Sequence, residues 1–397
     1  MTTPLMPTSE SELVAAIEPI TRAGGRIACE GNGTKRHHGP AAEAGARVVS
    51  LRGLSALIAY QPGDMVAVVQ AGMRFADLQR QLAAHNQWLP IDPPYADATV
   101  GGIVATASAG PRRFGNGTIK DYIVGIRTAG ADGVITKSGG RVVKNVTGYD
   151  LHRPHIGAFG TLGVIVEVNV RVVPRPDVVA VAAAGFSDAA TAHRRLLDVA
   201  SSRLRPTALE VYDGAVATAL RRACPELPAG AALALIGVEG TRPVMDRHRR
   251  DLGLGVPARW FEGAAADGVW SAVRDLPAAF AGAVVVRLGA RPYDLPGLLA
   301  EAGLSRAGTE ATMVQAGTGI ARVVLPADDL PAVAETLQAP RAIAARAGGY
   351  VVVESAPIGL PGRGRLPWRA GDGQALDERL RAAWDPSRRL NPGRMAS

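Results

Sequence analysis

The chain has 397 residues, of which 47% are hydrophobic and 20% charged, so it has enough apolar side chains for two or three folded domains and too little charge for a disordered polymer. The formal net charge is +8 at pH 7, but the basic residues are spread along the chain without a basic block, which argues against a nucleic-acid-binding surface. The two cysteines, Cys29 and Cys224, lie far apart, which excludes a disulfide scaffold, a CxxC redox pair and a cysteine-held iron–sulfur cluster.

The sequence pattern shows neither a targeting segment nor a membrane span. Residues 1–12 lack the basic and apolar regions of a signal peptide, and no stretch of about 18 apolar residues could cross a bilayer. We therefore expect a cytoplasmic protein without direct membrane insertion, and any association with a membrane would come through a partner.

The first half of the chain alternates short apolar segments with glycine-rich turns. Ser9 and Glu12 form a capping-box pattern for a first helix, which Gly24 ends. The pattern then predicts strands at residues 26–30, 47–51, 57–60 and 65–70, a helix that starts near residue 75, a hairpin at 123–136 and a long strand at 164–173. Pro174 and Pro176 end this last strand, and we place the first domain boundary at residue 175.

The second half predicts an α+β unit over residues 176–355. Apolar strand patterns and helical patterns alternate there, with strands at 178–186, 208–212, 233–239 and 283–288 and helices at 187–202 and 295–302. This order favours an open, antiparallel, ferredoxin-like sheet. The final segment, 356–397, contains a helix at 374–384, and its glycine and proline pattern is closer to that of the first half.

The glycine-rich turn at residues 31–35 is the first candidate for a binding site. A diphosphate needs several backbone N–H groups at short range, and glycine allows both a positive φ and a close approach. Lys35 or Arg36 would add a counter-charge. The same five residues also fit an ordinary surface turn.

Further glycine-rich loops recur at intervals between apolar strands, at residues 90–94, 98–103, 109–113, 148–150 and 157–163. Glycine in several loops at once fits a large flat ligand that passes many backbone segments, with a helix starting near Thr99 offering its N-terminus to a phosphate. The alternative is a loop-rich barrel without a ligand.

In order and spacing these segments resemble the FAD-binding domain of the vanillyl-alcohol oxidase / p-cresol methylhydroxylase (PCMH) superfamily. The resemblance covers residues 10–175 and extends to residues 385–386 and 390–393, which resemble the tail that returns to the flavin domain in that family. It implies an α+β chain with a two-subdomain PCMH-type FAD-binding domain (1–175), an α+β cap with a ferredoxin-like antiparallel sheet (176–355) and a C-terminal segment (356–397) that packs back on the first domain. The GxGxxG fingerprint of a Rossmann domain is absent.

The resemblance also assigns the cofactor, FAD, to particular residues of this sequence. By resemblance, the residues that hold FAD are Gly31, Asn32, Gly33, Thr34, Lys35, Pro90, Asp92, Ala98, Thr99, Val100, Gly101, Gly102, Gly110, Gly157, Gly160, Thr161, Leu162, Gly163 and Val164. Family members with covalent FAD carry histidine or cysteine in the first glycine turn, where this chain has Thr34, with His37 and His38 nearby. We therefore expect noncovalent FAD.

Within the superfamily, the chain is similar to the FAD-binding E subunits of glycolate oxidase complexes. Residues 110–113, 140–150 and 390–395 carry this likeness. It implies a flavoprotein that works with a second, catalytic flavin subunit and an iron–sulfur subunit to oxidise glycolate to glyoxylate, relaying electrons between them.

Catalytic groups are less evident than the cofactor site. Related D-2-hydroxyacid dehydrogenases carry a histidine-rich metal motif in the cap, and residues 317–322, where we would expect it, contain no ligand. His152 and His155 have helical spacing but no third ligand, so we expect no metal. Arg112 and Arg113 could hold a carboxylate or the pyrimidine edge of the flavin, or could form a surface ion pair.

Three functions therefore remain open from the sequence. The first is the electron-relaying FAD subunit of a 2-hydroxyacid dehydrogenase complex. The second is a self-sufficient FAD-dependent oxidoreductase for a hydroxyacid or alcohol. The third is a structural docking subunit with a weak or lost flavin site.

Overall fold

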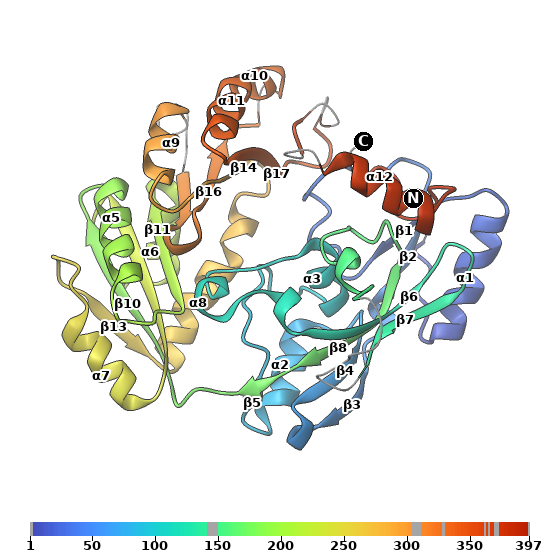
Figure 1. Ribbon diagram of the computed structural model, residues 1–397, viewed down its shortest axis with the longest axis horizontal. Helices are drawn as coiled ribbons and strands as arrows, with labels where there is room; N and C mark the ends of the chain where they lie inside the picture. Colours follow the sequence, from blue (N-terminus) through green and yellow to red (C-terminus); the bar gives the residue numbers. More distant parts are fainter. Residues whose placement is uncertain are drawn as a thin grey trace.

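The computed structural model describes residues 3–140, 150–303, 311–327, 330–360, 363, 366–368 and 373–395. Of the segment 140–150 that supported the resemblance, residues 141–149 lie outside the described residues. Figure 1 shows two lobes, the first built from the N-terminal half and the second from the middle of the chain, with α12 (Gln374–Trp384) on the side of the N-terminal lobe. Among the described residues, no helix is long and apolar enough to cross a membrane.

The N-terminal lobe starts with helix α1 (Glu10–Arg22), whose N-cap Ser9 accepts a hydrogen bond from the Glu12 N–H at 3.1 Å. The Glu12 carboxylate accepts from Thr8 rather than from Ser9, so only half of the expected capping box forms. The other helices and strands of this lobe are β1 (Ile27–Glu30), β2 (Arg47–Ser50), β3 (Leu57–Gln61), β4 (Val66–Gln70), α2 (Phe75–Ala83), β5 (Gln87–Trp88), α3 (Val100–Thr106), α4 (Arg113–Asn116), β6 (Ile123–Ala129), β7 (Ile135–Gly139), β8 (Val164–Arg171) and β9 (Val173–Pro174).

The strands of this lobe form two structural units. In the described residues, β1 and β2 form a parallel pair, and β3, β4, β8, β6 and β7 form a five-stranded antiparallel sheet in that order. Strand β8 lies at the centre and is buried at six of its eight positions, as its nearly continuous apolar sequence predicts. Helix α1, α3 and the strands share one hydrophobic core. The glycine-rich loops therefore connect strands and helices of one packed core, which fixes the positions of the loops.

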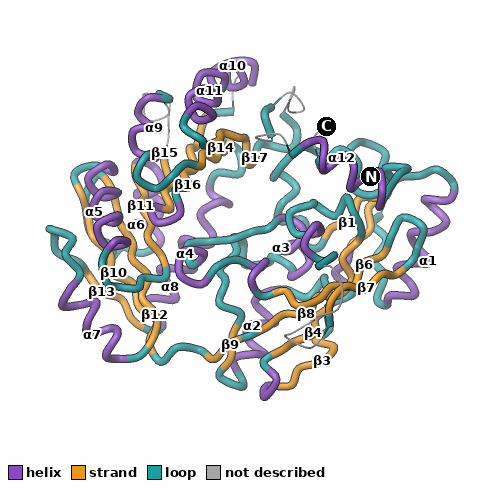
Figure 2. The backbone as a smooth tube through the Cα atoms, in the orientation of Figure 1, coloured by secondary structure: helices purple, strands orange, loops and turns teal. Residues whose placement is uncertain are grey.

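The second lobe contains one large antiparallel sheet flanked by helices (Figure 2). Its elements are β10 (Val178–Phe186), α5 (Ala189–Ser201), β11 (Ala208–Asp213), α6 (Gly214–Ala223), β12 (Ala232–Gly240), α7 (Arg242–Asp251), β13 (Arg259–Glu262), α8 (Ala264–Ala279), β14 (Val284–Gly289), α9 (Leu295–Glu301), β15 (Ala311–Gln315), β16 (Ile320–Leu325), α10 (Leu330–Thr336), α11 (Gln338–Arg346) and β17 (Tyr350–Ser355). The prediction of an α+β chain with an antiparallel cap sheet is confirmed.

The cap sheet consists of two ferredoxin-like halves. Its order in the described residues is β13-β10-β12-β11-β15-β16-β14-β17, so each half places its four strands in the order 4-1-3-2, counted from the outer edge. The second strands of the halves, β11 and β15, pair along the middle of the sheet. The sequence pattern indicated one ferredoxin-like sheet, and the structure shows two joined edge to edge.

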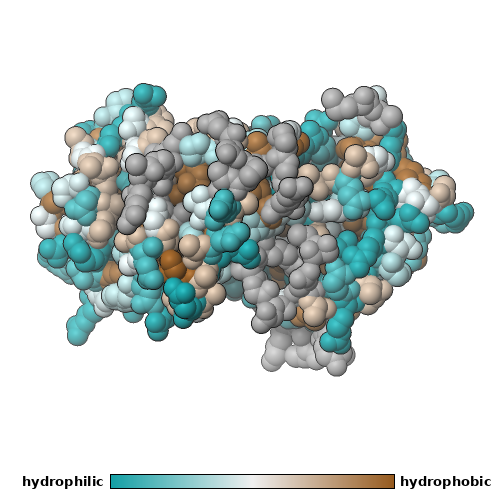
Figure 3. Space-filling view, turned by 90° about the horizontal axis from the view of Figure 1, so that it is seen from above, coloured by the Kyte–Doolittle hydropathy of each residue, from teal (hydrophilic) through white to brown (hydrophobic). Residues whose placement is uncertain are grey.

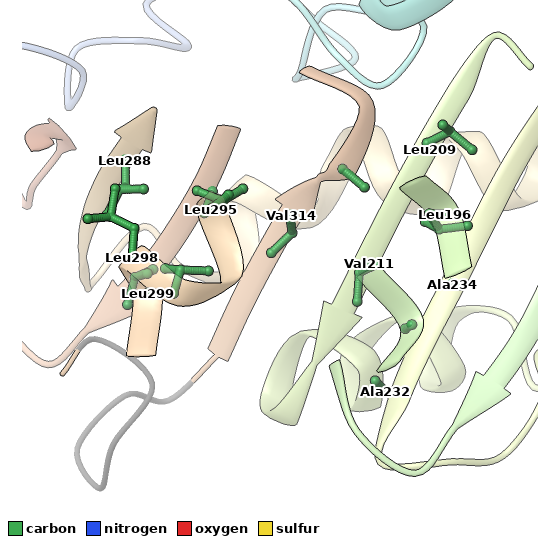
Figure 4. Packing of buried hydrophobic residues seen from close by; sticks show 14 of the residues in the cluster. Leu196, Leu209, Val211, Ala232, Ala234, Leu288, Leu295, Leu298, Leu299 and Val314 are labelled. Carbon is green, nitrogen blue, oxygen red and sulfur yellow. The ribbon is translucent and has the colours of Figure 1, made fainter. Parts of the chain in front are cut away.

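The two faces of the cap sheet have different surroundings. One face packs against α5, α7, α9 and α11, and Figure 4 shows leucines of α5 and α9 lying on the buried strand residues. On the other face α6 and α8 cover the first half of the sheet. Successive residues of a strand point to opposite faces of a sheet. Where α6 and α8 do not cover this second face, every second side chain of the strands therefore points toward the N-terminal lobe.

Candidate functional site

A cleft with a volume of about 350 Å³ lies between the two lobes. The N-terminal lobe contributes the loops around Asp92, Gly110 and Gly157, and the cap contributes side chains from β11, β14, β15, β16 and β17. On the face seen from above, the described parts of both lobes mix hydrophilic and hydrophobic side chains (Figure 3).

The glycine turn after β1 lies against the start of helix α3. A Cβ atom at Gly31 would lie 2.1 Å from Thr99 Oγ1, so only glycine fits there. Asn32 Nδ2 donates a hydrogen bond to the Asp97 carbonyl at 2.7 Å, and Thr99 caps α3 by accepting from the Gly102 N–H at 3.2 Å. Two segments that are far apart in the sequence and share the predicted cofactor role are thus in contact.

Lys35 is the basic residue of this turn, and its Nζ lies 6.0 Å from the centroid of the Tyr95 ring. It is 7% exposed, and within the described residues its Nζ makes no hydrogen bond. Burial lowers the pKa of Lys35 to about 7, although the Glu354 charge acts in the opposite direction. A buried amine that lacks a hydrogen bond and stands between its neutral and charged forms near pH 7 would be stabilised as an ammonium by an anionic group such as a phosphate.

Asn391 joins the C-terminal segment to two parts of the N-terminal lobe. Its Oδ1 accepts from the Cys29 N–H at 2.6 Å, and its Nδ2 donates to the Phe159 carbonyl at 2.6 Å. Its own N–H donates to the Ile27 carbonyl at 2.8 Å, while a Cβ at Gly160 would lie 2.5 Å from Asn391 Nδ2. The segment after α12 therefore holds β1 and the 157–163 loop together. Asn391 was absent from the predicted site, although it belongs to a motif that carried the resemblance.

The remaining predicted cofactor residues lie in or beside these loops. Asp92, Gly110 and Gly157 line the cleft, and a Cβ at Gly110 would lie 2.0 Å from the Asp92 carbonyl oxygen. Apolar and small residues of the same set are buried behind the loops, where they support the backbone: Pro90, Ala98, Val100, Gly101, Thr161, Leu162, Gly163 and Val164. Gly33 and Thr34 are half-buried within the turn, and Gly33 has a φ of +69°.

His152 and His155 do not face each other across a metal site. The ring of His155 stacks on Trp384 of α12 with 4.8 Å between centroids, and burial lowers its pKa to about 4. A Cβ at Gly163 would lie 3.1 Å from His155 Cε1, so the histidine supports the 160–163 loop. Among the described residues, no group of three or more His, Cys, Asp or Glu side chains could hold a metal.

Arg112 and Arg113 are adjacent in sequence but differ in environment. Arg112 lies between Trp88 and Trp270, with its guanidinium 5.3 and 5.7 Å from the ring centroids, and its Nε donates to Glu239 at 2.6 Å. It therefore joins the two lobes. Arg113 lines the cleft, and none of the described carboxylates forms an ion pair with it.

Three cleft residues, Arg113, Arg287 and Arg322, form what we call the arginine end. Arg287 on β14 lies directly opposite Arg322 on β16, a like-charged cross-strand pair that is unfavourable without a nearby anion. Arg322 pairs with Glu354 at 2.9 Å; burial alone would raise the pKa of Glu354, but the Arg322 and Arg287 charges hold it at about 2. Burial lowers the pKa of Arg113, and the charges of Arg322 and Arg287 lower it further. Within the described residues, Glu354 is the carboxylate that forms an ion pair in this group of three cations, through Arg322, and Glu210 also acts on Arg322.

Two histidines and a tyrosine lie between the glycine turn and the arginine end. The Tyr95 hydroxyl lies 2.6 Å from His37 Nε2, and burial lowers the pKa of His38 to about 3, with Glu354 opposing the shift. His38 and Ser355 form an isolated β-bridge. The Gly39 N–H donates to the Glu354 carbonyl and the Ala356 N–H donates to the His37 carbonyl, each at 3.0 Å, so the backbone after the turn is joined to the cap.

Comparison with known proteins defines the class of this chain. Residues 4–139 match the family described as "FAD binding domain", and residues 175–276 match the family "FAD linked oxidases, C-terminal domain". The chain therefore contains an FAD-binding domain followed by a domain of the FAD-linked oxidase C-terminal type, the order that is consistent with the PCMH-type FAD-binding superfamily.

Individual relatives give a sharper comparison. The chain is 38% identical over 122 residues to glycolate oxidase subunit GlcE from Escherichia coli (30% of this chain, 35% of that relative) and 29% identical over 188 residues to glycolate oxidase subunit GlcD from Bacillus subtilis (47% and 40%). It is 31% identical over 176 residues to a D-lactate dehydrogenase from Anaerostipes hadrus (43% and 36%). The matches thus span well under half the length of these curated relatives.

A solved structure of alkyldihydroxyacetonephosphate synthase shares the fold. It superposes with a TM-score of 0.68 at 20% identity, covering 100% of this chain and 78% of the synthase. At that identity the likeness establishes the arrangement of the domains and nothing about substrate.

Proposed function

We propose that this chain is the noncovalent FAD-binding subunit of a glycolate-type 2-hydroxyacid oxidoreductase complex, and that its cleft binds the carboxylate of the acid. The observation that supports this most strongly is the arginine end, in which, among the described residues, three cations have one ion-paired carboxylate beside the predicted FAD loops. Arginine binds carboxylates through paired N–H groups, and a small acid would balance the charge that Glu354 leaves uncompensated. The names of GlcE, GlcD and the D-lactate dehydrogenase are consistent with a 2-hydroxyacid as substrate.

The residues of this chain have distinct roles in the proposal. The 31–35 turn, the start of α3 and the 157–164 loop would hold FAD, with Lys35 beside a phosphate. FAD, when bound, supplies the acceptor for the electron pair released by oxidation of the hydroxyl-bearing carbon. Arg113 and Arg287 orient the acid by its carboxylate, and the two lobes exclude water from the cleft between them.

Electron transfer to an iron–sulfur subunit completes the proposal. The likeness to a protein named as a glycolate oxidase subunit supports a multi-subunit assembly. A second candidate is a pure relay, in which a separate catalytic flavin subunit, rather than an acid in this cleft, reduces the FAD. That candidate also rests on the subunit names.

The test uses the complex recovered with the tagged chain from its own host. Glycolate-dependent dye reduction is measured for the wild-type complex and for Arg287→Met, whose loss of one carboxylate contact is expected to raise the KM for glycolate by roughly tenfold or more. Arg194→Met, at an exposed position on α5, is the control and should leave the KM unchanged. An unchanged KM in Arg287→Met would contradict carboxylate binding in this cleft.

A further inference from the structure

The same cleft contains a second group of polar residues, Asp92, Glu210 and Gln315, which we call the acid end. Its side chains carry carboxyl and amide groups, whereas those of the arginine end are cations. Glu210 and Gln315 are register partners on β11 and β15, where the two halves of the cap sheet join. They are 2% and 4% exposed, and Asp92 reaches the cleft from the N-terminal lobe.

Each residue of the acid end has an oxygen without a hydrogen bond. Among the described residues, Asp92 Oδ1, Glu210 Oε1 and Gln315 Oε1 are buried without a hydrogen bond, and the Gln315 side chain lies beside Glu210, whose pKa it lowers against the larger effect of burial. The second carboxylate oxygens are occupied, because Asp92 Oδ2 accepts from the Arg112 N–H at 3.0 Å and Glu210 Oε2 accepts from the Tyr212 hydroxyl at 3.3 Å. A buried polar group without a partner costs about 1–3 kcal/mol. Two such acceptors on the cap wall and one on the opposite wall of the cleft indicate a ligand that donates hydrogen bonds.

Burial and the neighbouring charges favour the neutral forms of the carboxyl groups at the acid end. Burial raises the pKa of Glu210 well above its ordinary value, and the charge of Asp92 raises it further against the opposing charge of Arg322. Burial raises the pKa of Asp92 to about 7, with Arg112 opposing and Glu239 adding to the shift. The neighbouring Tyr212 stays a neutral phenol because burial and Glu210 raise its pKa. A neutral hydroxyl group therefore suits this end better than a cation does.

The acid and arginine ends lie close enough for one small molecule to reach both. Arg322 on β16 is paired with Met313 on β15, and Met313 precedes Gln315 by two residues on the same face of that strand. Neighbouring strands lie about 4.8 Å apart. Arg322 and Gln315 therefore enter the cleft from neighbouring strands, and the two ends adjoin at this point.

We propose that the acid end recognises the hydroxyl group of the ligand whose carboxylate is held at the arginine end. This inference rests on the proposed function, since it concerns the same acid in the same cleft, and it adds that the chain selects 2-hydroxyacids over simple carboxylic acids. The hydroxyl donates to an unpartnered oxygen of the acid end, while the protonated carboxyl group of Glu210 can donate in return.

The test measures binding to the FAD-loaded chain with two acids that cannot be oxidised at carbon 2. One is 2-hydroxyisobutyrate, which has no hydrogen on that carbon, and the other is isobutyrate, which has no hydroxyl. Calorimetry should show that the wild type binds the hydroxyacid at least about tenfold more tightly, because one added hydrogen bond in a buried site contributes on the order of 1–3 kcal/mol. Glu210→Met and Gln315→Met keep the side-chain length and should each reduce this preference to about twofold or less.

Two further variants separate this inference from the proposed function. Met313 lines the same wall and has no nitrogen or oxygen in its side chain, so Met313→Leu should keep the preference for the hydroxyacid. Arg287→Met should weaken the binding of both acids by the same factor. Equal binding of the two acids by the wild type, or a preference that survives in both Met variants, would overturn the acid end as the hydroxyl site while leaving carboxylate binding intact. If neither acid binds the folded, FAD-loaded wild type, the proposed function itself fails.

Discussion

The two walls of the cleft are built by different means. The N-terminal lobe presents backbone, because its loops depend on glycines such as Gly31 and Gly110 whose missing Cβ atoms allow close approach. The cap presents side chains, because single polar residues interrupt apolar strands and point from the uncovered sheet face. A cofactor with a long diphosphate suits the first wall, and a small charged acid suits the second. Under the proposed function, cofactor binding and substrate selection are therefore encoded by different parts of the chain.

The junction between the walls should be the most sensitive point. Arg112→Met removes a buried ion pair between the lobes and leaves Glu239 buried without its cationic partner, with only the hydrogen bond from Asn116, which is expected to cost about 3–5 kcal/mol in the free energy of unfolding. Arg113→Met, one residue away, should change stability much less and instead weaken acid binding. Urea unfolding and calorimetry of both variants check this, and equal destabilisation by the two would show that they share one role.

On the backbone wall, Asn391→Ala should loosen the C-terminal segment. It leaves the Cys29 N–H and the Phe159 carbonyl without their partner, which is expected to cost about 2–3 kcal/mol and to lower FAD retention on gel filtration. Asn391→Asp keeps the acceptor but not the donor, and it should lie between Ala and the wild type. If Asn391→Ala retains FAD as the wild type does, the segment is not part of the cofactor site.

A smaller but more specific change on the same wall is Gly31→Ala. Its Cβ would collide with Thr99, and the displaced turn is expected to weaken FAD binding by about 1–3 kcal/mol, or roughly 5- to 150-fold. Gly63→Ala, which meets no atom within 4 Å, is the matched control. FAD affinity measured by fluorescence quenching should change only in the first variant; an unchanged affinity in Gly31→Ala argues against FAD at this turn.

The side-chain wall should show a dependence on pH. The pKa of Glu354 is depressed in the folded chain to about 2, so its contribution to stability is complete above the unfolded value near 4.5 and is lost as the pH falls toward 2. Between pH 6 and pH 3 the wild type should therefore lose about 1–2 kcal/mol relative to Glu354→Gln. The same comparison for Glu262→Gln, at an exposed ion pair, should give a smaller change in stability between pH 6 and pH 3. An equal change for the two variants would contradict a special role of Glu354 beside the arginines.

These two walls also explain what could be predicted from the sequence. The backbone wall is encoded by repeated glycine motifs. The sequence assigns the 31–35 turn and the residues around Thr99 to the same cofactor, and their contact in the structure is consistent with that assignment. The side-chain wall depends on isolated residues in apolar strands, such as Glu210 in β11 and Arg287 in β14, whose common location follows from strand pairing far along the chain. A polar residue at an inward position of an otherwise apolar strand was the available signal. The doubled cap sheet likewise depends on the pairing of β11 with β15, which no local pattern specifies.

The central claim is that an arginine-lined cleft in this chain binds a 2-hydroxyacid beside FAD. The most direct measurement is an anaerobic titration of the FAD-loaded chain with glycolate, followed by the visible spectrum of the flavin. The account predicts a saturable change, which Arg287→Met shifts to roughly tenfold higher glycolate or more. Bleaching would show that the acid reduces this flavin, whereas a shift without bleaching would indicate that a catalytic flavin subunit supplies the electrons. A spectrum that glycolate leaves unchanged at every concentration would contradict the account.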